Sequence, residues 1–161
     1  MIVVSNTSPI TSLAAIGQFE LLQKLYGRIH IADAVWHELN HGGRRYPGSQ
    51  EVEDASWVDR HAVKNQALVI VLRRDLDQGE SETLALAIEL EAGLVLLDEQ
   101  EGRHAAVRSG LRPLGVLGIL LQAKDLGAIE EIRPLLDVLR EQAGFFIGKS
   151  LYRQVLEQAG E

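Results

Sequence analysis

The sequence predicts an α/β protein in which helices cover both faces of a mainly parallel sheet. Continuous apolar runs at residues 2–5 (IVVS) and 94–97 (LVLL) have polar flanks, which is typical of strands buried on both faces of a parallel sheet. Helix-like stretches separate these runs from weaker strand candidates. An alternation of strands and helices indicates a three-layer α/β/α sandwich.

Three shorter segments are expected to complete the sheet: residues 29–32 (IHIA), 58–63 (VDRHAV) and 111–114 (LRPL). The second suits an edge of the sheet. Pro113 weakens the third, because proline cannot donate a hydrogen bond to a neighbouring strand. Residues 41–49 (HGGRRYPGS) are expected to form a mobile loop, since Gly, Pro and Ser interrupt regular structure.

Helix start and stop signals lie between these strands. Ser8 and Pro9 supply an N-cap and a first-turn proline, Asp33 is expected to cap the helix that contains AVWHEL, and Gly79 precedes a helix that ends at Gly93. Further helices are expected over residues 101–109, 116–124, 130–141 and 149–158.

Length and composition favour one domain over residues 1–161, because 161 residues with 46% hydrophobic side chains can form a sizeable core. Residues 143–161 are expected to be an apolar C-terminal extension that packs on this domain or on a dimer partner. The absence of cysteine excludes disulfides, thiolate metal sites and a cysteine nucleophile. The apolar start is too short for a signal peptide or a membrane span, which predicts a soluble cytoplasmic protein without membrane association.

The charge is unevenly distributed. A net charge of −7 argues against a broad basic surface for nucleic acid. Nine of the 23 acidic residues lie between residues 75 and 101. Two interpretations are open: a solvated helix face with a turn, or a set of acids of which a few converge on a metal ion.

Several polar side chains are expected to meet at the carboxyl ends of the strands, where parallel sheets form a crevice. Asn6 and Asp98 each follow a predicted central strand, and Glu80 begins a helix. Glu82 lies about 200° further around that helix and should face elsewhere. Glu38 lies at the edge of the apolar stripe of its own helix.

These oxygen donors indicate a site for Mg²⁺ or Mn²⁺, which prefer carboxylate, amide and water oxygens. The absence of Cys and the scatter of the five histidines argue against zinc. Each acid has a simpler interpretation as a surface residue or a helix cap, and Asp98 in particular could cap the helix that follows it. Ser8 has the same alternative.

Five motifs occur in an order found in one family: VVSNTSPI, AVWHEL, GESETLALA, LLDEQEGRHAA and PLGVLGILLQAK. The chain resembles PIN-domain proteins over nearly its whole length, and most closely a prokaryotic branch that begins with a Ser-Asn-Thr-Ser-Pro stretch. The resemblance implies a metal-dependent ribonuclease that leaves a 5′-phosphate, often the toxin of a toxin–antitoxin pair, and a homodimer. It also implies that Glu38, Glu80 and Asp98 are metal-binding acids, with Glu101 as a further ligand.

Asn6 departs from the family pattern, which usually has aspartate at this position. An amide oxygen can bind Mg²⁺ but adds no charge, and two-metal phosphodiester cleavage relies on negative charge to hold both ions. Two interpretations follow. Asn6 is a neutral ligand in a weaker or one-metal nuclease, or the chain is a catalytically inactive module that binds nucleic acid or protein.

An acidic groove has to attract RNA through residues at its rim. The candidates are Ser8, whose hydroxyl could reach the site, and the arginines Arg44, Arg45 and Arg103, with Arg73, Arg74 and Arg108 as further cations. Ordinary surface charge is the alternative for each arginine. Dinucleotide and P-loop motifs do not follow any predicted strand.

Overall fold

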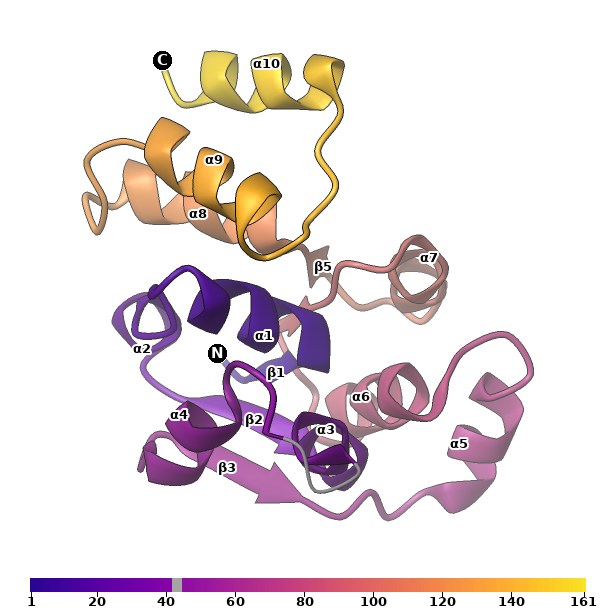
Figure 1. Ribbon diagram of the computed structural model, residues 1–161. Helices are drawn as coiled ribbons and strands as arrows, with labels where there is room; N and C mark the ends of the chain where they lie inside the picture. The colour runs from indigo at the N-terminus through magenta and orange to yellow at the C-terminus, as the bar shows by residue number, and fades with distance from the viewer. Residues whose placement is uncertain (42–44) are drawn as a thin grey trace.

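The computed structural model describes residues 1–41 and 45–161 and confirms the predicted α/β fold (Figure 1). In these residues five parallel strands form one sheet in the order β3-β2-β1-β4-β5. The strands are β1 (Val3–Ser5), β2 (Ile29–Ala32), β3 (Val58–His61), β4 (Leu94–Leu96) and β5 (Pro113–Leu114). All five predicted strands are therefore confirmed, some of them shorter than expected, and residues 58–61 do lie at an edge.

Helices lie on both faces of the sheet. Their bounds in the described residues are α1 (Thr7–Ala15), α2 (Leu21–Tyr26), α3 (Asp33–Leu39), α4 (Ser49–Asp54), α5 (Gln66–Leu72), α6 (Gln78–Glu89), α7 (Gln100–Arg108), α8 (Val116–Asp125), α9 (Arg133–Glu141) and α10 (Lys149–Gln158).

Three of these helices, α2, α4 and α5, were not predicted. Each has only six or seven residues, too few to show a clear apolar period. The predicted cap at Asp33 is wrong: Ala32 occupies the N-cap position, and Asp33 is the first helical residue and pairs with Arg60. Of the loop predicted at residues 41–49, residues 42–44 lie outside the described residues, and Ser49 already begins α4.

The core consists of two apolar layers, one on each face of the sheet. Val3, Ile29 and Ile31 belong to one layer, and Val4 and Ala32 belong to the other. Neighbouring residues of a strand therefore point to opposite faces, as the pleat requires. Both faces of β1 and β4 are buried, which explains why these segments are continuously apolar in the sequence.

The C-terminal helices α8, α9 and α10 lie together, as Figure 1 shows. Ile147, Val155 and Leu156 are buried in the same core layer as Val3. The Glu161 carboxylate accepts hydrogen bonds from the Ile132 and Lys124 nitrogens, at 2.7 and 2.8 Å. In the described part of the chain no helix has the length and apolar character needed to cross a membrane.

Candidate functional site

A cluster of polar and acidic side chains lies where β1 and β4 end. Asn6 directly follows β1, and its backbone N–H donates to Leu96 of β4 at 2.9 Å. Asp98 follows β4 by two residues, while α3 and α6 contact each other beside the strands and carry Glu38 and Glu80. Four segments distant in sequence thus deliver oxygen-bearing side chains to one end of the sheet.

Asn6 occupies the centre of this cluster and is only 3% exposed. Its amide Nδ2 donates to Glu99 Oε2 at 3.3 Å, and its Oδ1 accepts from the Thr83 hydroxyl at 3.3 Å. Although Asn6 precedes α1 at the N-cap position, its side chain makes no capping bond there. The amide is therefore used to join α6 to the segment after β4.

Glu38 projects from α3 toward α1 and the first turn of α6. The Thr7 hydroxyl donates to Glu38 Oε2. A Cβ atom at Gly79 would lie 2.1 Å from Glu38 Oε1, so the glycine leaves space for the carboxylate. Burial raises the pKa of Glu38, and the charges of Asp77 and Glu99 act in the same direction, against the Thr7 hydrogen bond.

Glu80 is held by the first turn of its own helix. Its backbone N–H donates to Asp77 Oδ1 at 2.8 Å, and its Oε2 accepts from the Asp77 N–H at 3.3 Å, a reciprocal capping box. The side chain is 7% exposed. Burial, together with the charges of Asp77, Glu99 and Glu38, raises the pKa of Glu80 to about 7. Glu82 instead accepts a hydrogen bond from the Ala34 backbone at 3.2 Å.

Asp98 has one oxygen occupied and one free. Its Oδ1 accepts from the Val116 N–H at 2.9 Å, so it caps α8 rather than the helix that follows it in sequence. Its Oδ2 is buried and has no partner among the described residues. Burial raises the pKa of Asp98 to about 6, opposed by the Val116 hydrogen bond and by the Arg103 charge.

Glu99 is the member of the cluster that the sequence analysis did not include. Its two oxygens accept hydrogen bonds from Asn6 and Ser8. Glu101, which the resemblance put forward instead, is exposed in the first turn of α7. The only signal for Glu99 in the sequence is its position directly after Asp98. Which acid of the DEQE segment turns inward depends on the path of the chain into α7.

A family model described as a PIN domain matches residues 2–161. The chain belongs to the PIN-domain family. No curated protein and no solved structure matches it significantly. The family assigned from the five motifs is thus confirmed, and a PIN domain has a nuclease-type fold. The match does not distinguish branches within the family.

The predicted RNA-binding residues of this PIN domain have different surroundings. The Ser8 hydroxyl is already hydrogen bonded to Glu99. Arg103 lies close to the metal-site candidates, because a Cβ atom at Gly115 would lie 2.8 Å from its Nη1 and 2.7 Å from Asp98 Oδ1. Arg45 donates hydrogen bonds to two side chains of α4, Gln50 and Glu53. Arg44 lies outside the described residues.

The acidic cluster of the PIN domain suits a hard divalent cation. The available ligand atoms are carboxylate and amide oxygens. Asp98 Oδ2 is buried and has no hydrogen-bond donor beside it in the described residues, and a bound cation would supply the missing positive charge. In the described residues, no three of these acids bring one oxygen each within 4.8 Å of one another. In this arrangement a Mg²⁺ ion could contact at most two of these acids directly and would reach the others through bound water.

The five histidines were expected to be scattered, but two of them lie together in the structure. His30 lies on β2 and His61 on β3, and the distance from His30 Nδ1 to His61 Nε2 is 2.9 Å. Asp59 lies beside both rings. Thirty-one positions separate the two histidines in sequence, so only the pairing of β2 with β3 brings them together.

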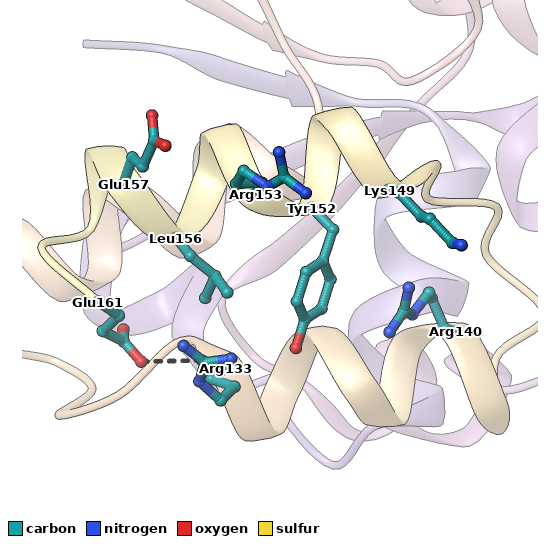
Figure 2. Close-up of a pocket in the computed structure, with 8 residues that line it drawn as sticks. All are labelled: Arg133, Arg140, Lys149, Tyr152, Arg153, Leu156, Glu157 and Glu161. Carbon is teal, nitrogen blue, oxygen red and sulfur yellow. Dashed lines mark hydrogen bonds between the residues drawn. The ribbon is translucent and has the colours of Figure 1, made fainter.

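A cavity of about 620 Å³ lies away from these acids, between α9 and α10. Figure 2 shows cationic side chains from both helices gathered there: Arg133, Arg140, Lys149 and Arg153. The Arg140 guanidinium lies over the Tyr152 ring, 4.2 Å from its centroid, and the Tyr152 hydroxyl donates to Asp137. Glu157 and Glu161 also line the cavity, so its lining has more cationic than acidic side chains.

Proposed function

We propose that this PIN domain is a ribonuclease that depends on Mg²⁺ or Mn²⁺ and hydrolyses RNA phosphodiester bonds. One observation carries the proposal: Glu38, Glu80 and Asp98 gather with Asn6 and Glu99 at the end of the sheet, and Asp98 Oδ2 is buried without a partner in the described part of the chain. Such a group of oxygens is costly to bury without a cation.

The residues divide into ligands and supporting groups. Asn6, Glu38, Glu80 and Asp98 would hold the ion, some of them through bound water, and Glu99 positions both Asn6 and Ser8 through hydrogen bonds. A bound divalent ion would lower the pKa of water for in-line attack and offset charge that develops on the phosphate oxygens. Without metal the pKa of Glu80 is about 7, so binding of a cation would release a proton from this carboxyl group near neutral pH.

RNA would approach past Arg103, whose guanidinium lies beside Gly115 as Asp98 does, and the product would carry a 5′-phosphate, as the family resemblance implies. The role of a toxin, silenced by an antitoxin protein, is part of the same proposal. It is supported by the family rather than by any contact within the chain.

Replacing Gly79 by alanine tests the function with little risk to the fold. Gly79 is helical, so alanine favours α6, but its Cβ would displace the Glu38 carboxylate. We expect Gly79→Ala to keep its thermal midpoint while Mg²⁺-dependent cleavage of single-stranded RNA falls at least about 100-fold, comparable to the loss of one positioned catalytic group. Glu80→Gln should lose activity similarly.

Cleavage by wild type that is insensitive to chelator, or cleavage by both variants at the rate of the parent, would contradict the proposal. Glu101→Gln is the matched control, because it removes an exposed carboxylate from α7 near the site. It should cleave RNA as the parent does.

The second candidate is a PIN-like module that binds nucleic acid or a protein partner without cleavage. The observation that favours it is the use of Asn6 as a neutral hydrogen-bonding group to Thr83 and Glu99. In that case the protein binds RNA equally well with Mg²⁺ and with chelator and leaves it intact.

We also propose a homodimer, which Phe146 is placed to stabilise. The tail residues Ile147, Val155 and Leu156 are buried within the chain, but Phe146 is 89% exposed and Leu151 41% exposed. Deleting the tail would uncover the core, so a point substitution is the cleaner test. We expect Phe146→Ser to convert a dimer into a monomer by light scattering at micromolar concentration, with an unchanged thermal midpoint for the dilute protein. A parent that is monomeric at all concentrations refutes the dimer.

A further inference from the structure

Three potential metal ligands outside the acidic cluster lie on one face of the sheet. His30 of β2 is paired in register with Asp59 of β3, and Ala32 is paired with His61. Residues two apart in a strand point to the same side. These three side chains therefore project from the same face of the sheet, from the edge strand β3 and its neighbour β2. Ile29 and Ile31 point to the opposite face.

The distances between their donor atoms are close to those of a tetrahedral metal site. His30 Nδ1 lies 2.9 Å from His61 Nε2 and 3.8 Å from Asp59 Oδ2. One atom from each of the three residues lies within 4.8 Å of the other two. Zinc–ligand bonds of about 2.0–2.2 Å place tetrahedral ligands about 3.3–3.5 Å apart. The separations of 2.9 and 3.8 Å lie on either side of this value, so small side-chain shifts suffice.

A hydrogen bond between two imidazoles would explain the histidine pair without any metal. It would not explain the placement of the carboxylate. Arg28 Nη1 holds Asp59 Oδ1 at 2.8 Å and also donates to the Ser56 carbonyl, which leaves Oδ2 directed at His30. Holding one carboxylate oxygen while the other faces the ligand cluster is how supporting residues orient metal ligands.

The access of the cluster also suits a metal. All three residues are only half-buried, which leaves an entry path for an ion.

We propose that His30, Asp59 and His61 bind one Zn²⁺ ion, with water in the fourth position. Two imidazole nitrogens and one carboxylate favour zinc over Mg²⁺, which prefers oxygen ligands. The ion would join the edge strand β3 to β2 by side chains in addition to the backbone pairing. It would stabilise the fold and leave the acidic cluster free for a hard cation.

The test uses full-length protein without a histidine tag, stripped of metal and titrated with Zn²⁺ in competition with a chromophoric chelator. We expect one Zn²⁺ per chain and a rise of a few degrees in thermal midpoint. His61→Gln should weaken Zn²⁺ binding by about 100-fold or more, since even loss of a supporting group costs 10- to 100-fold. Asp59→Asn provides a second variant that alters the site without touching either ring.

Two controls separate this site from other metal ligands. His104→Gln removes an exposed histidine of α7, and Asp98→Asn changes the acidic cluster; both should bind Zn²⁺ as the parent does. The proposal is overturned if the parent binds no stoichiometric Zn²⁺, if His61→Gln and Asp59→Asn bind it equally well, or if Asp98→Asn is the variant that loses it. None of these outcomes depends on nuclease activity.

Discussion

Asp98→Asn is expected to abolish the thermal stabilisation of the protein by Mg²⁺ or Mn²⁺. The substitution keeps an oxygen that can accept the Val116 N–H but removes the charge from the partnerless Oδ2. Metal at a 100-fold excess over its Kd should stabilise the parent by about 2.7 kcal/mol, or roughly 5–11 °C for a chain of this size. Differential scanning fluorimetry with and without metal measures the difference.

The pH dependence of the metal-free protein supplies a second readout of the same cluster. Burial raises the pKa of Glu80 to about 7 and that of Asp98 to about 6 in the folded chain, above the ordinary values of 4.5 and 3.8 for these side chains. The folded state therefore binds more protons than the unfolded state. The resulting stability is fully present below about pH 4 and is lost as the pH rises through 6 to 7. Added Mg²⁺ should restore it at pH 8.

Glu101→Gln is the matched control, since it removes the same charge from an exposed position of α7. It should keep the full metal-dependent shift. A shift that survives in Asp98→Asn, or that disappears in Glu101→Gln, would place the ion elsewhere than between the ends of β1 and β4.

Asn6→Asp is expected to make the protein less stable without metal and more strongly stabilised by metal. The Asn6 amide donates to Glu99 Oε2, and aspartate would replace this donor by a second carboxylate at hydrogen-bond distance. Two carboxylates so close repel and raise each other's pKa. A cation bound beside these two carboxylates would offset the repulsion between them. We expect the Kd for Mn²⁺ to fall about tenfold by calorimetry, less than the added charge alone would give, because burying another carboxylate is costly.

RNA cleavage should rise in the same variant, most clearly at low metal concentration, if the PIN domain is an under-charged nuclease. Asn65→Asp makes the same change of charge at the N-cap of α5, where the side chain accepts from the Leu68 N–H and aspartate can do likewise. It should leave metal affinity unaltered. An Asn6→Asp protein that binds metal no more tightly than its parent would show that Asn6 supports Glu99 without contacting the ion.

The sequence by itself determined the fold class, because continuous apolar strands and amphipathic helices are both local patterns in the chain. Residues 3–4 and 94–97 are all apolar because both faces of these central strands are buried. Asn6 directly follows β1, and Asp98 follows β4 by two residues. The amphipathic pattern of the longer helices was legible for the same reason. The short helices α2, α4 and α5 were not, because tertiary packing rather than an apolar period stabilises six or seven residues.

Only the tertiary structure decided which side chains meet. It turned Glu99 rather than Glu101 toward Asn6, made Asp98 the cap of a helix 18 residues away, and required a glycine at position 79 to admit Glu38. It also paired His30 with His61 through the register of β2 and β3. Each of these contacts depends on the relative placement of elements far apart in the chain, and a register shift of one residue would turn His61 to the opposite face.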